Sequence, residues 1–400
     1  MDSKLPELHE INTALIKAAV EDDPDEINRI LDLGADPNYC DGVWEITPLQ
    51  TAISRGNIHS AAALLEGGAE TDPRDATNRT PIYIAAQRGD VQSVLLLLDA
   101  GAYINGCPDD GPARVPLHAA AKSDNIKMTE FLVHHGADIK KRNDIGLTAF
   151  HSAIMGAALN TAKYLLSLGA DPYATDAGGN TPFHTAAKRE ADIEVLRFLG
   201  DLGKDPGLFL NENGESPLYT AVANCNPLGV EYLLEHGSDP NAKSERFGYS
   251  ALAKAIDMTG GDRPFKIIKL LLEHGADPNI VTSCCDNIAV FSMRKKNLRV
   301  IPLLIKYGLD VGYTDDEGKG LLHTAALNGR AGIMKHLAKA GADLWETDGR
   351  GRTPMDILKT FHPEVYSSSR KKIEESTANR QRLRAEDRVK EAATGYEFDI

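Results

Sequence analysis

The chain has 400 residues, 42% of them hydrophobic and 26% charged, as in a soluble globular protein and unlike a disordered, collagen-like or disulfide-rich chain. Its 58 acidic and 44 basic residues leave a formal net charge of -14, which argues against nucleic-acid or anionic-membrane partners, since these favour an excess of Lys and Arg. No apolar run approaches the roughly 20 residues of a membrane span and no signal peptide is recognisable, so we expect a cytoplasmic or nuclear protein.

A short sequence phrase recurs along the chain. It begins with a hydroxyl residue, which in many copies is followed by a Pro, and continues with an apolar residue and an Ala-rich stretch. Thr80-Pro81-Ile82 and Thr181-Pro182-Phe183 are clear copies, whereas the copy at Asn287 is weak. A fixed period of this length indicates stacked repeats. The starts are 33 to 37 residues apart, near positions 13, 47, 80, 115, 148, 181, 216, 250, 287, 320 and 353.

A second phrase, Leu-Leu-x-x-Gly-Ala-Asp or a close variant, follows the first ten starts, in most copies 21 residues after the start. The Thr or Ser of the first phrase can cap a helix, and Pro suits the first helical position. The Gly of the second phrase suits the left-handed position after a second helix. Asp36-Pro37-Asn38 and its equivalents then begin a turn. Each repeat is therefore predicted to be a helix–turn–helix unit with a projecting turn.

This pattern resembles the ankyrin repeat over nearly all of residues 1–360, most clearly in Pro116-Leu117-His118-Ala119-Ala120. The resemblance implies an all-α repeat solenoid of stacked helix–turn–helix units with β-turn fingertips, whose usual activity is to bind another protein through a concave face. It also implies that the His residues of the first phrase are structural. These are His118, His151, His184 and His323.

Two regions depart from the repeat. Twenty-five residues separate Ser250 from Gly275, and the extra length is predicted as a loop near residues 258–264. This region is either a drifted but folded repeat or a place where the array opens. Residues 361–400 carry balanced charge and few apolar residues. We interpret them as a charged tail, partly helical or disordered, that is solvated, supplies a closing helix or docks a partner.

The sequence contains no complete catalytic or metal-binding motif. The stretch Gly312–Gly320 lacks the spacing and the hydroxyl of a phosphate loop. The five cysteines lack metal-ligand spacing and are predicted to be free thiols. His135, His236 and His274 precede a helix-ending Gly, where a His can satisfy terminal carbonyl groups. We therefore expect no enzyme, no metal and no cofactor.

The resemblance places partner contacts at the end of the first helix of each repeat and at the turn tips. Apart from Asp257, the charged residues at these helix ends are basic, which predicts an inner stripe that binds an acidic segment of a partner protein. The alternative is that they are ordinary helix ends, where cations complement the helix dipole. The predicted stripe comprises Arg55, Arg88, Lys122, Lys188, Arg189, Arg294 and Lys295, with Arg79 and Arg114 at turn tips.

Aromatic residues at the turn tips are the predicted energetic anchors of binding. They are Trp44, and Phe247 with Tyr249 beside Arg246, unless they only cover the repeat core. The sequence thus favours a scaffold or adaptor that binds another protein. The alternative is an enzyme or a small-molecule-binding protein with a pocket in the groove, formed where Asp144, Lys188, Glu212 and Asp257 converge.

Overall fold

The computed structural model describes residues 8–40, 42–106, 114–189, 193–246, 248–258, 261–282 and 287–376. Phe247, the cysteines at 107, 284 and 285, and residues 377–400 of the predicted tail lie outside these ranges. Contacts divide the chain into two compact units. The first comprises Met1–Ala186, Ala191–Lys204 and Phe209–Glu212, and the second comprises Ala187–Glu190, Asp205–Leu208 and Asn213–Ile400.

Within the described ranges the chain is helical, as predicted, and its only β contacts are isolated bridges. Up to residue 200 the helices are α1 (Leu8–Glu21), α2 (Pro24–Asp32), α3 (Pro48–Arg55), α4 (Ile58–Glu66), α5 (Pro81–Arg88), α6 (Val91–Asp99), α7 (Pro116–Lys122), α8 (Ile126–His134), α9 (Ala149–Met155), α10 (Leu159–Ser167), α11 (Pro182–Ala187) and α12 (Ile193–Gly200). After it come η1 (Pro206–Leu208), α13 (Pro217–Ala223), α14 (Pro227–Glu235), α15 (Ala251–Asp257), α16 (Asp262–Glu273), α17 (Ile288–Arg294), η2 (Leu298–Val300), α18 (Ile301–Lys306), α19 (Leu321–Leu327), α20 (Ala331–Ala340) and α21 (Pro354–Phe361).

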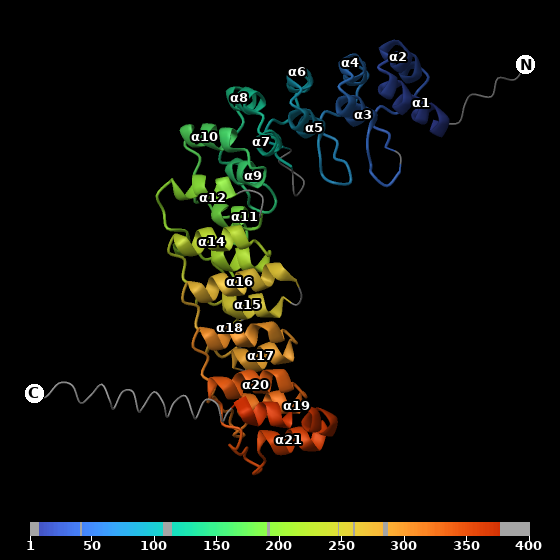
Figure 1. The fold of residues 1–400 in the computed structure, drawn as a ribbon. Helices are drawn as coiled ribbons and strands as arrows, with labels where there is room; N and C mark the ends of the chain where they lie inside the picture. The colour runs from blue at the N-terminus through green and yellow to red at the C-terminus, as the bar shows by residue number, and fades with distance from the viewer. Residues whose placement is uncertain are drawn as a thin grey trace, which may run out of the picture. The chain divides into compact units, whose positions relative to one another are not determined.

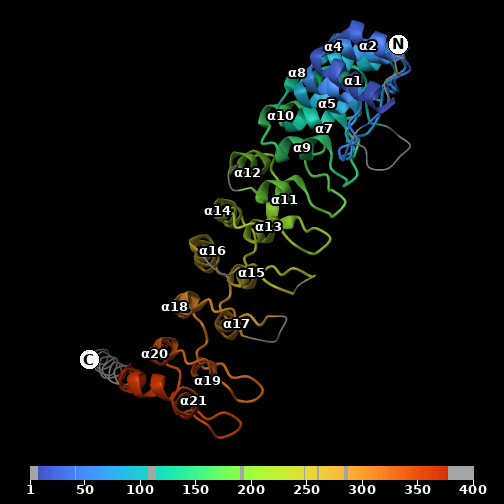
Figure 2. The same cartoon turned by 90° about the vertical axis from the view of Figure 1, so that its right-hand side faces the viewer.

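The helices pack in consecutive pairs, α3 with α4 and α5 with α6 in the first unit, α13 with α14 and α15 with α16 in the second (Figure 1). The first member of each pair, here called the inner helix, packs on the next inner helix, so that α3, α5, α7 and α9 follow one another. In Figure 2 the turns of the second unit project from the side of α15, α17 and α19, away from the outer helices α16, α18 and α20. A pair buries its remaining apolar face only against a neighbouring pair, which explains the stacking.

The predicted caps begin most inner helices. The hydroxyl oxygen of Thr80 accepts a hydrogen bond from the Tyr83 N–H, and Thr47, Thr148, Ser216, Ser250 and Thr353 do the same in their helices. The prediction that Thr13 caps a helix is wrong. Thr13 lies within α1, where its hydroxyl donates to the His9 carbonyl oxygen.

The inner helices contribute a large part of the core. In α7 every residue from Pro116 to Ala121 is buried, and in α9 the side chain of Phe150 is fully buried. The stack is tight enough to require a glycine after α9. A Cβ added to Gly156 would lie 2.0 Å from the carbonyl oxygen of Lys122 on the neighbouring inner helix. Only glycine allows this approach of the two backbones.

The extra length after Ser250 was predicted as a loop over 258–264, but this is wrong for its last residues. Asp262, Arg263 and Pro264 form the first turn of α16, which has 12 residues whereas α14 has 9. At the other end of the unit, a further helix spans residues 363–376, and its Ile373 is buried. None of the described helices is both long and apolar enough to cross a membrane.

Candidate functional site

Five of the projecting turns are held by the same side-chain contact. The Oδ1 atom of Asp75 accepts hydrogen bonds from the backbone N–H groups of Thr77 and Arg79, both at 2.9 Å. Such Asx-type contacts hold a turn in one conformation, so side chains at these turn tips are presented rigidly. The same contact, from the N–H groups two and four residues later, is made by Asn143, Asp176, Asp315 and Asp348.

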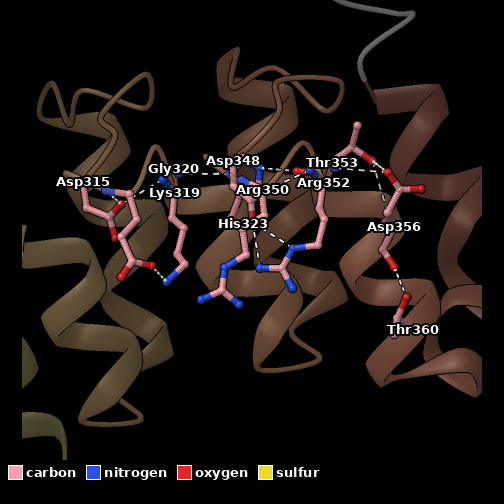
Figure 3. A network of polar contacts seen from close by, with 11 residues as sticks. Asp315, Lys319, Gly320, His323, Asp348, Arg350, Arg352, Thr353, Asp356 and Thr360 are labelled. Carbon is pink, nitrogen blue, oxygen red and sulfur yellow. Dashed lines mark hydrogen bonds and ion pairs between the residues drawn. The ribbon is translucent and has the colours of Figure 1, made fainter.

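Figure 3 shows this contact at Asp348, which is only 4% exposed. Its Oδ2 atom accepts a hydrogen bond from Nη2 of Arg352 at 2.8 Å. Burial alone would raise the pKa of Asp348, but hydrogen bonds from the Arg352 side chain and from the backbone N–H groups of Arg352 and Arg350 lower it to about 2. The Gly349 N–H donates to the Glu317 carbonyl oxygen at 2.8 Å and joins two neighbouring turns.

The two basic residues predicted at turn tips are both used within the fold. Arg79 is half-buried, and its Nε atom lies 2.7 Å from Oδ2 of the buried Asp75, so it reinforces its own turn. Arg114 is exposed, and its Nε donates to the Thr77 carbonyl oxygen at 2.8 Å. Its guanidinium carbon lies 5.9 Å from the centre of the Tyr83 ring. Arg114 therefore connects the start of one repeat with the turn of the preceding repeat.

Three of the predicted stripe residues end successive inner helices of the first unit. Arg55, Arg88 and Lys122 are the last residues of α3, α5 and α7, and all three are exposed. Arg88 donates from Nη1 to the Ser54 carbonyl oxygen at 2.6 Å and so bridges two repeats. No carboxylate in the part of the chain that the structure describes pairs with any of the three. We refer to Arg55, Arg88 and Lys122 as the inner basic edge.

In the second unit the predicted stripe is partly neutralised. Lys188 and Arg189 are exposed after α11, and Arg294 is exposed at the end of α17. Nζ of Lys295 lies 2.5 Å from Oδ1 of Asp257. Asp257, the one acidic residue among these predicted helix-end positions, therefore neutralises the charge of Lys295.

The predicted aromatic anchors differ in their surroundings. Trp44 is 63% exposed at its turn, as an anchor requires. Tyr249 is half-buried and meets the ring of buried Phe291 edge-on, with 5.7 Å between centroids, so it also covers the core. Arg246 is exposed beside it, and Phe247 lies outside the described residues. No contact tests a partner-binding role for these residues, and the role stays a prediction.

A cavity of about 260 Å³ lies in the first unit against α5, α7 and α9. Sequence reasoning did not predict Tyr83, Ile145 or Met155 as site residues, although Ile145 and Met155 had a readable signal. Met155 occupies the repeat position of Lys122, and Ile145 is an apolar turn-tip residue that is 55% exposed. The lining includes Tyr83, Arg114, Lys122, Asp144, Ile145 and Met155.

The predicted convergence of polar residues for an enzyme or small-molecule site is not seen in this cavity. Of the four residues named for it, Asp144 lines the cavity, whereas Lys188, Glu212 and Asp257 are not among its lining residues. Asp257 is instead paired with Lys295. Within the described ranges, no group of three or more His, Cys, Asp or Glu side chains could hold a metal ion, and Cys40 and Cys225 are free thiols.

The histidines have the structural roles predicted for them. Nε2 of His151 lies 3.3 Å from the Asn180 carbonyl oxygen, and Nε2 of His323 lies 3.2 Å from that of Arg352. In each of the three histidines that precede a helix-ending Gly, Nδ1 contacts the carbonyl oxygen of the residue four positions earlier. These are His135, His236 and His274.

His118 is the exception within this set. Its Nε2 lies 3.0 Å from the Lys141 carbonyl oxygen, but its buried Nδ1 has no hydrogen-bond partner. Burial lowers the pKa of His118 to about 4, so the ring is neutral at pH 7. Nδ1 of His118 lacks a partner because Val115 precedes α7 at the position that Thr148 has before α9. In that repeat the Oγ1 atom of Thr148 lies 3.0 Å from Nδ1 of His151.

Val115→Thr is therefore expected to stabilise the first unit by about 1 kcal/mol, since it adds a helix cap and a partner for His118. Urea unfolding followed by circular dichroism measures the change. Val94→Thr is the matched control, because Val94 is fully buried inside α6 and its hydroxyl would serve no helix start. The control should destabilise. A loss of stability in both variants would contradict the assignment.

Comparisons with known proteins agree with this geometry. A family model described as "Ankyrin repeats (3 copies)" matches residues 15–107, 183–282 and 252–348, and one described as "Ankyrin repeats (many copies)" matches 117–166 and 157–200. The human "Ankyrin repeat and MYND domain-containing protein 1" is 31% identical over 257 residues, which cover 58% of this chain and 22% of that protein. The mouse "B-cell lymphoma 3 protein homolog" is 29% identical over 258 residues, which cover 63% of this chain and 49% of that protein.

The chain thus spans less than half of the length of either relative. Among solved structures, the human ASB11 ankyrin repeat domain is similar with a TM-score of 0.46 and 26% identity, covering 56% of this chain and 98% of that one. The family models cover well over half of the chain, from residue 15 to residue 348 with one short gap at 108–116. Ankyrin repeats are generally protein-interaction modules, and this chain belongs to the ankyrin-repeat family.

Proposed function

We propose that the chain is a non-enzymatic scaffold or adaptor, and that an acidic segment of a partner protein binds along the inner basic edge. The observation that carries the proposal is the exposure of Arg55, Arg88 and Lys122 at the ends of three neighbouring inner helices, without a carboxylate partner among the described residues. A row of like charges with no internal counter-charge attracts a partner of opposite charge and speeds its association.

The charges at the ends of the outer helices indicate that Arg55, Arg88 and Lys122 do more than complement the helix dipole. Asp32, Glu66 and Asp99 are exposed and end the outer helices α2, α4 and α6 of the same unit. A carboxylate at a helix C-terminus is unfavourable for the dipole, by about 0.3–1 kcal/mol. The ends of these three outer helices therefore do not follow the dipole rule. The basic inner ends instead reflect a separation of charge between the two rows of helices, within a chain whose net charge is -14.

The test is a double charge reversal, Arg55→Glu with Lys122→Glu. Arg88 is left intact because it bridges to Ser54, and its loss would disturb packing. Wild type and variant, both shown to be folded by circular dichroism, are used to capture partners from a native-cell lysate for mass spectrometry. The variant is expected to lose the main partner at least tenfold, which corresponds to 1.4 kcal/mol or more.

The control reverses two exposed lysines elsewhere in the first unit, Lys127→Glu with Lys140→Glu, and should retain the partner. Binding of wild type should also weaken as salt rises from about 50 to about 300 mM, since exposed charges are screened over shorter distances at higher ionic strength. Equal capture by both variants, together with salt-independent binding, would contradict the proposal, as would the capture of no protein at all.

A further inference from the structure

We propose that the cavity beside the inner basic edge is an anchor pocket that receives one large apolar side chain of the partner's acidic segment. The apolar part of the anchor pocket's lining is presented by Tyr83, Ile145 and Met155, whereas Val115 and Leu147 also line it but are themselves buried. This inference rests on the proposed function, because Lys122 belongs to both the inner basic edge and the lining of the pocket. It adds the chemical class of the segment: an aromatic or large aliphatic residue with acidic residues on either side.

The volume of the pocket favours a side chain over a free ligand. At about 260 Å³ it is below the roughly 300–1,000 Å³ of typical small-molecule sites. The apolar part of the wall suits an apolar occupant. Met155 has a flexible, polarizable side chain that adapts to irregular shapes. Ile145 is 55% exposed, so a bound side chain would cover apolar surface that water now contacts.

The charges around the pocket favour acidic neighbours for that side chain. Lys122 is exposed and has no ion-pair partner among the described residues. Nε of Arg114 donates to the Thr77 carbonyl oxygen, and the guanidinium carbon lies 5.9 Å from the centre of the Tyr83 ring. Asp144 is the only carboxylate in the described lining. Two cations therefore face one anion, and an acidic segment gains more at these positions than a basic one.

The pocket is preformed by contacts within the first unit. Tyr83, Lys122 and Met155 of its lining come from the inner helices α5, α7 and α9, of which α7 packs against both others. The turn tip is fixed as well, because the Ile145 N–H donates to Oδ1 of Asn143 at 3.2 Å and its carbonyl oxygen accepts from the Ala177 N–H at 3.0 Å. A wall that is ordered before binding loses little conformational entropy when an anchor enters.

The experiment selects random twelve-residue peptides, displayed on phage, against the full chain. The expected consensus is a single Phe, Trp, Tyr, Leu, Ile or Met flanked by Asp or Glu. The strongest binder is then synthesised together with two analogues, one with the apolar residue changed to Ala and one with the acidic residues changed to Gln. Each replacement should weaken binding by about tenfold or more, as loss of a buried anchor does.

The protein variant that tests the pocket is Ile145→Asn, which removes an apolar wall without adding charge. It should weaken the parent peptide by about tenfold and leave the Ala analogue unchanged. Leu208→Asn is the matched control, since Leu208 is 75% exposed in the second unit, and it should change neither affinity.

The outcomes separate this inference from the proposed function. Acidic peptides without an apolar anchor, weakened by Arg55→Glu with Lys122→Glu but not by Ile145→Asn, would overturn the pocket and leave the basic edge standing. Basic or uncharged consensus peptides would overturn both. A selection that enriches no peptide would overturn the pocket as a peptide site. A dimer in sedimentation that Ile145→Asn abolishes would also overturn it, and would mean that a second copy of the chain fills the pocket.

Discussion

Phe150→Ala is expected to destabilise the first unit by about 3–5 kcal/mol, the largest effect of any single substitution considered for this chain. Phe150 is the second residue of α9 and is fully buried among inner helices. Truncation to Ala removes apolar surface that folding takes out of water. It also leaves a cavity that the stack cannot close, because α9 is held at close range by Gly156 against the backbone of Lys122.

The loss should be local, since each repeat of such a stack contacts only its neighbours. Hydrogen exchange followed by mass spectrometry should show faster exchange in α7 and α9 and unchanged exchange in α19 and α21, while urea unfolding gives the free energy. Phe361→Ala is the matched control, because Phe361 is 54% exposed at the end of α21 and should cost less than about 0.5 kcal/mol. A cost below about 1 kcal/mol for Phe150→Ala would show that the α9 core is loosely packed.

Asp348→Ala should destabilise the second unit by about 3 kcal/mol at pH 7. The substitution removes the acceptor for two backbone N–H groups and leaves the guanidinium group of Arg352, which is about one-third exposed, without its carboxylate. Asp348→Asn should cost less, about 1–2 kcal/mol, since Asn143 already makes the two backbone contacts of this turn type elsewhere in the chain. Asp316→Ala, at an exposed turn position, is the control and should be nearly neutral.

The contribution of Asp348 to stability should also depend on pH in a defined direction. Its pKa is about 2 in the folded chain against an ordinary value of 3.8, so the unfolded chain binds more protons between these pH values. The stabilisation is therefore complete above about pH 4 and is lost as the pH falls towards 2. Urea unfolding of wild type and Asp348→Asn at pH 7, 4, 3 and 2.5 should show a difference that shrinks with acidity. A constant difference would mean that Asp348 is not ionised in the folded chain.

The local structure of each repeat could be read from the sequence because its causes are local. A hydroxyl residue caps the helix that begins beside it, as Thr47, Thr148 and Thr353 do, and a glycine takes the left-handed position that follows a helix. Local sequence signals gave the wrong helix start at Thr13. This residue carries the repeat phrase but lies in the middle of α1, since the first helix begins before the residues that the phrase marks.

The candidate site could be predicted only in part. The positions of Arg55, Arg88 and Lys122 at inner helix ends follow from the repeat register, and the structure places them there. Which basic residues are engaged within the fold does not follow from it. Lys295 meets Asp257, and Arg88 meets the carbonyl group of Ser54, each more than thirty residues away in the chain. The missed pocket residues Tyr83, Ile145 and Met155 likewise come from different repeats.

The sequence by itself thus determined the repeat period, most of the helix starts and ends, the structural histidines and the family, because capping, turn formation and helix termination depend on residues within one repeat. Only the tertiary structure decided which charges remain unpaired, why the ring of His118 lacks a partner, and where a pocket opens. Those properties arise when neighbouring repeats stack and bring residues about 33 positions apart into contact, and the contacts depend on the particular side chains that two repeats present to each other.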